Sequence, residues 1–194
     1  MAGRPKIFEE SEVIGRAMEV FWEKGYEAAS ADELLAAMGI GKGSFYLAFK
    51  GGKKELYIKS LQQFSAKYAE TFKAGLAKSE NKMDFLRSVF LNLTDEAESN
   101  KNKCCYIGNA LVQAPVGDTD TRKVAIQLLK RMEPIYADVI RKAQEENLIK
   151  TKEDPIVLGR FLLNLWNGIN VTRKMDIPAD ILKTTIALNL QLIS

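Results

Sequence analysis

Helical periodicity is the feature that most constrains the fold of this chain. Apolar residues recur three and four positions apart along most of its length, and no segment alternates apolar and polar residues with a period of two. The sequence therefore predicts an all-α protein without a sheet and without internal repeats. The helical pattern covers residues 13–22, 34–38, 42–49, 56–72, 85–93, 124–143, 156–171 and 181–192.

Two short helices joined by a tight turn are predicted near the N-terminus. Ser30 and Glu33 have the Ser-x-x-Glu spacing of a capping box, in which the hydroxyl and the carboxylate bind amides at a helix start. Gly39 can adopt the left-handed conformation that ends this helix, and Gly41 can cap a second helix through residues 42–49. The segment thus has the length, the capping residues and the turn glycines of a helix-turn-helix.

Glycines, prolines and polar residues mark the other predicted helix boundaries. They are Gly25 at the end of the first helix, Gly75 near the end of a long helix, and Asn81, Asp154-Pro155 and Pro178 at helix starts. Pro134 removes one hydrogen bond from the helix predicted over residues 119–147, so we expect a kink or break there.

The charge and the missing residue types exclude several classes of protein. A net charge of +3 on 194 residues is too small to indicate nucleic-acid binding by itself. The chain has no histidine, so Ser-His and Cys-His catalytic pairs and imidazole-bound metals are unavailable. We therefore expect no enzymatic activity, no metal and no cofactor.

The sequence also favours a cytoplasmic protein. It has no run of about 20 uncharged apolar residues, and the start, Met-Ala-Gly-Arg-Pro-Lys, lacks the apolar core of a signal peptide. The two cysteines, Cys104 and Cys105, are adjacent and cannot link distant segments, which is typical of a reducing compartment.

Positive charge is concentrated in one short stretch of the chain. Residues 34–60 contain five lysines against Glu55 alone, whereas residues 1–33 contain four basic and eight acidic residues. In a helix-turn-helix the second helix reads bases in the major groove while amides, hydroxyls and lysines bind phosphates. The candidate DNA-contacting residues on this reasoning are Ser30, Lys42, Ser44, Tyr46, Lys50, Lys53 and Lys54. A lysine run is also commonly a solvated helix face, so the spacing alone leaves both interpretations open.

A resemblance to a known family is carried by Glu23-Lys24-Gly25-Tyr26 and by residues 30–49, which include Met38-Gly39-Ile40-Gly41-Lys42-Gly43-Ser44-Phe45-Tyr46. Residues 7–60 resemble the DNA-binding head of the tetracycline-repressor family of transcriptional regulators. The resemblance implies a three-helix head in which Tyr46 and Lys53 or Lys54 bind phosphates. It implies base-reading residues among Lys42, Gly43, Ser44, Leu47 and Ala48.

The head departs from the family pattern at three places. Gly41 stands where the family commonly has Ser or Thr, which removes a side-chain cap. Leu47 and Ala48 replace residues that are often polar or aromatic, so base reading would rely on thymine methyl contacts. Gly51-Gly52 makes the linker one residue longer than usual, which leaves open which lysine takes the family position in the next helix.

The predicted domains are a helix-turn-helix head over residues 1–52, a linking helix at about 53–75, and a ligand-sensing and dimerisation domain over 76–194. Within the last of these, Cys105–Leu111 and Phe161–Gly168 resemble a subgroup of repressors that respond to electrophiles and oxidants. In that subgroup a cysteine at the position of Cys105 can be the sensor.

The expected partners are double-stranded operator DNA, a second copy of the chain and a small-molecule effector. Operators of this family are typically near-palindromes, which implies a homodimer. The last two helices are apolar on more than one face, so we expect them to form a four-helix interface between subunits; a place in the intramolecular core is the alternative. Effector binding would release DNA through the helix from about Lys53 to Lys73.

The candidate ligand-binding residues are Phe90, Cys105, Tyr106, Asn109, Gln113, Trp166, Asn167, Asn170 and Arg173. A place in the core is the alternative for the aromatic residues, and a solvated helix end is the alternative for Arg173.

Thiol chemistry is a second possible signal. Cys104 and Cys105 follow Lys101 and Lys103, and nearby ammonium groups together with a helix start favour a reactive thiolate. Adjacent Cα atoms are about 3.8 Å apart, below the usual disulfide range of roughly 4.4 to 6.8 Å, so an adduct or sulfenate is favoured over a vicinal disulfide. An inert buried cysteine is the alternative.

The sequence therefore favours an effector-responsive DNA-binding repressor over two other classes. A thiol-dependent enzyme would lack a Cys-x-x-Cys spacing, a histidine base and a cofactor fingerprint. A helical small-molecule-binding protein that does not bind DNA stays open because of Leu47, Ala48 and the extra glycine. Salt-dependent operator binding separates the regulator from both.

Overall fold

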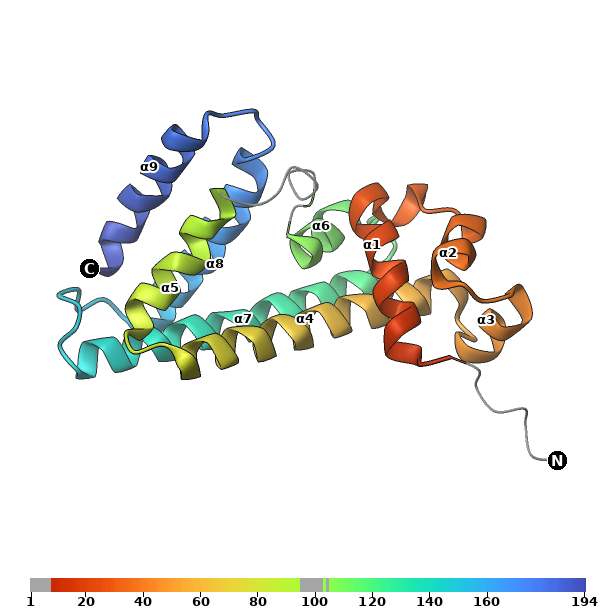
Figure 1. Ribbon diagram of the computed structural model, residues 1–194, viewed down its shortest axis with the longest axis horizontal. Coiled ribbons are helices and arrows are strands. Elements are labelled where there is room, and N and C mark those ends of the chain that lie inside the picture. Colours follow the sequence, from red (N-terminus) through yellow and green to blue (C-terminus); the bar gives the residue numbers. More distant parts are fainter. Residues whose placement is uncertain (1–7, 95–102, 104) are drawn as a thin grey trace.

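The computed structural model describes residues 8–94, 103 and 105–194. Its elements are α1 (Glu10–Ala28), α2 (Ala31–Met38), α3 (Lys42–Ala48), α4 (Gly52–Lys78), α5 (Lys82–Leu91), the 3-10 helix η1 (Asn92–Thr94), α6 (Tyr106–Gln113), α7 (Thr119–Glu145), α8 (Pro155–Thr172), α9 (Ala179–Leu190) and the 3-10 helix η3 (Gln191–Ile193). Every regular element in these residues is helical, which confirms the all-α prediction (Figure 1).

A three-helix head sits on the N-terminal half of α4 (Figure 1). The Ser30 side chain caps α2 in the predicted capping box, and Gly39 ends the helix in the left-handed conformation with φ 67°. Gly41 begins α3 without a side-chain cap. Phe21 of α1 and Phe49 after α3 are buried, so the head has its own apolar centre. The predicted helix-turn-helix is thereby confirmed.

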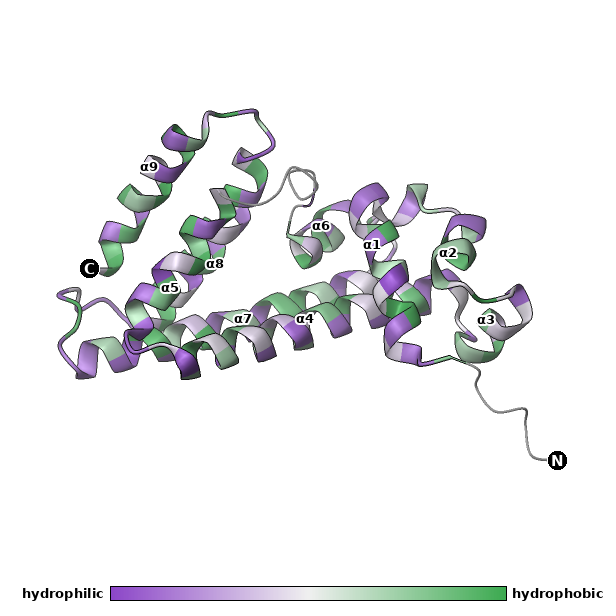
Figure 2. Cartoon of the chain, in the orientation of Figure 1, coloured by the Kyte–Doolittle hydropathy of each residue, from purple (hydrophilic) through white to green (hydrophobic). Residues whose placement is uncertain are grey.

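The body is built on α4 and α7, which lie side by side along most of their length (Figure 1). Helix α8 packs against α7, α5 packs against α7 and α9, and α6 lies between α7 and the head helix α1. Apolar residues are distributed along α8 and α9 (Figure 2). The predicted starts of α5 and α8 are confirmed, because Asn81 and Asp154 accept hydrogen bonds from the first amides of these helices.

The sequence marked two interruptions, at Gly25 and at Pro134. The interruption at Gly25 is confirmed, since Gly25 has φ 81° and ψ 167° and kinks α1, although helical residues continue to Ala28. The break expected at Pro134 is wrong, because α7 runs from Thr119 to Glu145 as one element, and a kink there stays a prediction. Pro134 lies on an exposed side, where water can bind the carbonyl that has lost its donor, and contacts with α4 and α8 hold the rest of α7 in place.

No described helix combines the length and apolarity that crossing a bilayer requires. Helices α7 and α8 instead approach each other closely through a glycine. A Cβ atom at Gly159 would lie 2.7 Å from the carbonyl oxygen of Glu133 and 3.1 Å from Cβ of Ala137. Since one of these neighbours is backbone, it cannot rotate away, and the absence of a side chain at this position permits the packing of α8 on α7.

We expect Gly159→Ala to lower the free energy of unfolding by about 1 to 3 kcal/mol, because the added methyl group overpacks the α7–α8 contact. The matched control is Gly15→Ala in α1, where the nearest atom to the new Cβ would be Nε2 of Gln63 at 3.6 Å. That variant should be unchanged or stabilised by up to about 1 kcal/mol, since alanine favours a helix. Urea unfolding at one protein concentration measures both, and equal effects would contradict the close approach.

Candidate nucleic-acid interface and sensing core

Helix α3 presents one face to solvent and one to the head. Phe45 and Phe49 are buried, and their rings lie 5.4 Å apart between centroids. On the opposite side Leu47 is 81% exposed and Tyr46 is 52% exposed, which leaves a large apolar side chain and a phenol open to solvent. Of the residues proposed to contact DNA from this helix, Lys42, Gly43 and Ser44 are also exposed, and Ala48 is half-buried.

The N-terminus of α2 is occupied by the protein's own carboxylate. Oγ of Ser30 accepts a hydrogen bond from the amide of Glu33 at 3.3 Å, and Oε2 of Glu33 accepts from the amide of Ser30 at 3.1 Å. Glu33 also pairs with Lys24. The hydrogen bonds from Lys24 and Ser30 lower the pKa of Glu33 to about 2. Ser30 therefore acts in this structure as a cap; its predicted phosphate contact stays a prediction.

The lysines of the α3–α4 region have different surroundings. Lys42 and Lys50 are exposed and form no ion pair within the described part of the chain. Nζ of Lys53 donates to the carbonyl of Glu27 at 3.3 Å and lies 4.6 Å from the centroid of the Tyr26 ring. Lys54 forms ion pairs with two aspartates of the body. The two lysines predicted at the start of α4 thus bind other parts of the protein.

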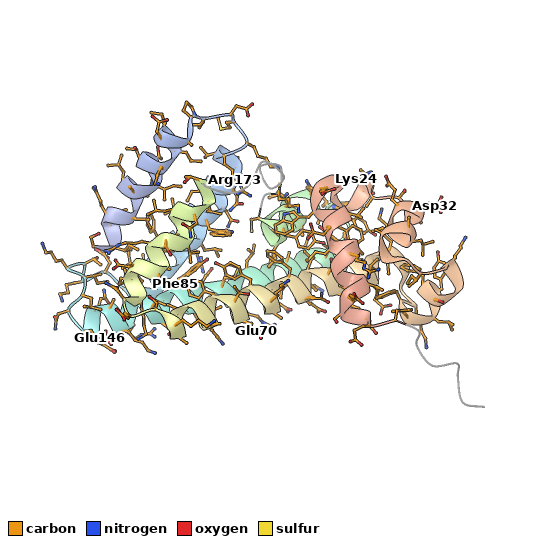
Figure 3. All side chains as sticks on the ribbon, in the orientation of Figure 1. Lys24, Asp32, Glu70, Phe85, Glu146 and Arg173 are labelled. Carbon is orange, nitrogen blue, oxygen red and sulfur yellow. The ribbon has the colours of Figure 1, made fainter. Side chains whose placement is uncertain are left out.

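An aromatic cluster fills the centre of the body. It consists of Tyr68, Phe72, Phe90, Tyr136 and Trp166. The two phenols share a hydrogen bond of 2.8 Å between their Oη atoms, and burial raises the pKa of Tyr68 to about 12. Side chains fill the space enclosed by α4, α5, α7 and α8 (Figure 3). Two predicted ligand residues, Phe90 and Trp166, accordingly meet here in a packed core.

Cys105 is the N-cap residue of α6. It is 7% exposed, and its Sγ accepts a hydrogen bond of 3.3 Å from the amide of Gly108. A Cβ atom at Gly108 would lie 2.8 Å from Oδ1 of Asn167 and 3.2 Å from Sγ of Cys105, so this glycine lets α6 and α8 close on each other. The sulfur is therefore surrounded by protein and aligned with the N-terminal amides of a helix, which favour a thiolate.

The lysine expected to activate the thiol has another partner. Nζ of Lys103 pairs with Glu19 of α1 at 2.6 Å and lies 5.4 Å from the centroid of the Trp22 ring. Its charge is compensated by this carboxylate, so activation of Cys105 by Lys103 is not supported. Lys101 and Cys104 lie outside the described residues.

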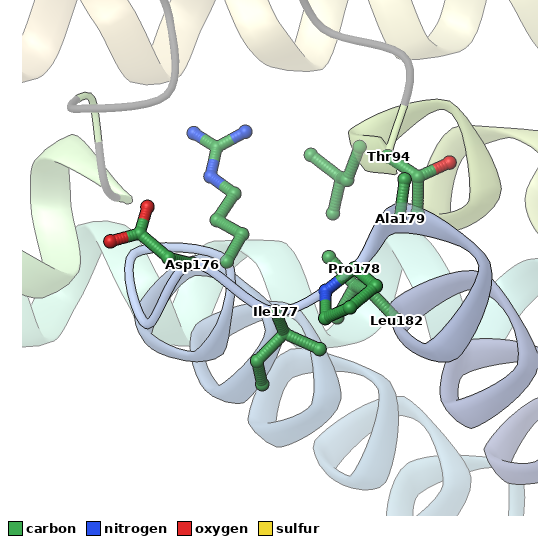
Figure 4. A pocket seen from close by; sticks show the side chains of 8 residues that line it. Thr94, Asp176, Ile177, Pro178, Ala179 and Leu182 are labelled. Carbon is green, nitrogen blue, oxygen red and sulfur yellow. The ribbon is translucent and has the colours of Figure 1, made fainter.

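Four other predicted ligand residues lie in two separate places. Tyr106, Asn109 and Gln113 of α6 line a cavity of about 80 Å³ against the end of α1. Arg173 donates to the carbonyl of Lys103 and lines a pocket of about 320 Å³ at the α8–α9 connection. Asp176, Ile177, Pro178, Ala179 and Leu182 surround this pocket with Thr94 of η1 (Figure 4).

The sequence analysis missed the buried hydroxyl pairs that join these helices. Oγ of Ser60 in α4 lies 2.7 Å from Oη of Tyr106 in α6, and burial raises the pKa of Tyr106. Asn170 donates to the carbonyl of Trp166 within α8 and is 3% exposed. The sequence contained one signal for the Ser60 hydrogen bond, because Ser60 lies on the apolar side of α4. A buried hydroxyl needs a hydrogen-bond partner.

Comparison with known proteins agrees with this geometry. Residues 13–59 match the model of a family described as bacterial regulatory proteins, tetR family. YezE of Bacillus subtilis (strain 168), an uncharacterized HTH-type transcriptional regulator, is 27% identical over 183 residues, covering 90% of this chain and 92% of YezE. The HTH-type transcriptional repressor ComR of Escherichia coli (strain K12) is 24% identical over 178 residues, covering 89% and 82%.

A solved structure of similar fold contains DNA. It is a cysteine mutant of the TetR family transcriptional regulator CifR, complexed with a 26-bp double-strand operator. The TM-score is 0.81 at 22% sequence identity, and the alignment covers 97% of this chain and 98% of that one.

The head, the exposed α3 and the helical body together define a helix-turn-helix transcriptional regulator. The head matches the tetR family of bacterial regulatory proteins over residues 13–59, and most of the chain is similar to HTH-type transcriptional regulators. The relatives are regulators, which points away from an enzyme.

We expect Ser30→Ala to lower the free energy of unfolding by about 1 kcal/mol, because one amide at the start of α2 loses its acceptor. Ser11→Ala is the matched control, since Ser11 is an exposed serine in the first turn of α1 and does not cap it. Thermal unfolding compares the two variants. If Ser11→Ala lost as much stability as Ser30→Ala, the capping box would contribute nothing specific.

Proposed function

We propose that this regulator is a homodimeric repressor whose two α3 helices bind the halves of a near-palindromic operator, and that an effector in the body releases it. The observation that carries the proposal is the exposed face of α3, where Lys42, Ser44, Tyr46 and Leu47 stand on buried Phe45. Lys42 has the donors for a phosphate or a guanine, and Leu47 has the apolar surface for a thymine methyl group.

The surface of α8 and α9 supports dimerisation through these helices. Their large apolar residues that are more than half exposed are Ile156, Val157, Val171, Ile181 and Leu188, with Leu192 in η3. Exposed apolar residues at this density on two neighbouring helices favour burial against a second copy in a four-helix arrangement. A two-fold dimer places two small heads on one operator, as its symmetry requires.

A cytoplasmic electrophile is the effector class that Cys105 favours. After the thiol proton has passed to solvent, the thiolate would add to the activated carbon–carbon double bond of an electrophile such as a maleimide. The carbon–sulfur bond forms as the π bond breaks, and the neighbouring carbon then takes a proton from solvent. Because Cys105 is buried at the start of α6, an adduct has to displace packed side chains. Overpacking costs about 1 to 3 kcal/mol. That range matches the coupling of roughly 1 to 3 kcal/mol typical of allosteric release.

The first test is a gel shift with DNA upstream of the protein's own gene, at several salt concentrations. We expect a dimer that binds with an affinity that falls steeply with salt, since lysines bind phosphates. A helical binding protein without DNA affinity is the second candidate, favoured by the apolar Leu47 and Ala48 on α3. Failure to enrich any sequence from fragmented genomic DNA would favour that candidate and contradict the repressor.

The thiol step is tested by repeating the gel shift after N-ethylmaleimide treatment. We expect the apparent Kd to rise about 5- to 150-fold, which is the usual range of allosteric coupling. Cys105→Ser should bind DNA normally and resist the reagent, whereas the control Cys104→Ser should respond like the unmodified protein. An unchanged Kd in the modified wild-type protein would leave a DNA-binding regulator with a non-covalent effector.

A further inference from the structure

Lys54 connects the start of α4 to the start of α7. Its Nζ lies 2.8 Å from Oδ1 of Asp118, the N-cap of α7, and 2.9 Å from Oδ2 of Asp120. These residues are more than 60 positions apart in the sequence, and the two helices run side by side from this point (Figure 1). One cation therefore binds two carboxylates of the body from the first turn of a helix that carries the head.

The carboxylate of Asp118 is held by Thr121 as well as by Lys54. Asp118 accepts hydrogen bonds from the amide of Thr121 at 3.2 Å and from its hydroxyl at 2.6 Å. The Asp118 side chain is 14% exposed, while that of Lys54 is 39% exposed. Burial opposes the charge of Asp118, but the hydrogen bonds from Lys54 and Thr121 outweigh it and lower its pKa. Hydrogen bonds to both aspartates raise the pKa of Lys54.

A phosphate would have to compete with both aspartates for this ammonium. The two carboxylates more than compensate its single positive charge, so the local charge repels an anion. An isolated exposed ion pair contributes little, but here the cation joins two acceptors and one of them is already ordered.

The first turn of α4 is also tied to the head. Oε2 of Glu55 accepts from the amide of Gly51 at 2.7 Å, in the turn that follows α3. Lys59 pairs with Glu55 at 3.2 Å and with Glu10 of α1 at 2.7 Å. The first two turns of α4 therefore carry contacts to the α7 N-terminus, to the α3–α4 turn and to α1.

We propose that Lys54 is a positioning residue, which fixes the DNA-binding head on the body through Asp118 and Asp120 and does not itself bind a phosphate. The inference rests on the proposed operator binding. It also assigns a route by which changes at α6, which precedes α7 in the chain, reach α3.

The salt dependence of operator affinity distinguishes a positioning lysine from a phosphate contact. Loss of a phosphate contact reduces the slope of log K against log salt by about 0.9 for each contact. Lys54→Met should therefore leave this slope unchanged. It should lower operator affinity by roughly 2- to 30-fold, which is the effect of one partly exposed ion pair squared. The effect is squared because a dimer contains two Lys54 links. Lys42→Met is the matched control, and its slope should fall.

The aspartates give a test in which the two roles predict opposite signs. Asn retains the capping ability of Asp, so the Asp118→Asn, Asp120→Asn double variant should fold. A positioning role predicts weaker operator binding, and no further loss when Lys54→Met is added. Tighter binding in the double variant, with a steeper salt slope, would show that the aspartates had withheld Lys54 from a phosphate and would overturn the inference.

If the wild-type protein binds no DNA, the proposed function is contradicted but the inference about Lys54 is not. A distance measurement then still tests the inference. Spin labels at Ser44→Cys in α3 and Lys130→Cys in α7, in a Cys104→Ser, Cys105→Ser background, report the position of the head on the body. A broader or shifted distance distribution in Lys54→Met supports the inference, and an unchanged one overturns it.

Discussion

Helix α4 belongs to both halves of the molecule, and its packing against α1 on one side and α7 on the other is the constraint on which the rest of the structure depends. Leu56 and Leu61, near its start, are fully buried, while Phe72 joins the aromatic cluster of the body. Because one helix carries both contacts, a turn of the head would move residues next to the aromatic cluster of the body. This geometry makes regulation of DNA binding from the body physically possible.

Aromatic side chains and hydrogen-bonded hydroxyl groups fill the interior of the body. The hydroxyl groups of Tyr68 and Tyr136 form a hydrogen bond, and so do those of Ser60 and Tyr106 where α4 meets α6. Each pair costs free energy if one partner is displaced, because a buried hydroxyl then lacks a hydrogen bond. A ligand or a thiol adduct that enters here thus acts on contacts that reach directly to α4, whereas the pocket at the α8–α9 connection lies toward the proposed subunit interface.

The candidate site was predictable only where function depends on local sequence. The exposed face of α3 followed from the apolar spacing of Phe45 and Phe49, and the capping box followed from Ser30 and Glu33. The nine predicted ligand residues share no single cavity, because periodicity places a side chain on a helix face without saying which helix that face meets. The aromatic cluster brings together residues from four helices, and the Lys54 link joins two helix starts whose pairing no local signal encodes.

The sequence by itself determined most of the helices, many of their ends and the helix-turn-helix, since caps, glycines and apolar spacing act over a few residues. It did not determine that α1 would continue past Gly25 or that α7 would pass through Pro134, because the contacts that stabilise those segments come from other helices. Only the tertiary structure decided that Lys103 pairs with Glu19 and that Lys54 pairs with Asp118 and Asp120. Charged side chains are long and find partners through space, so the fold decides which lysines stay available for DNA and which hold the protein together.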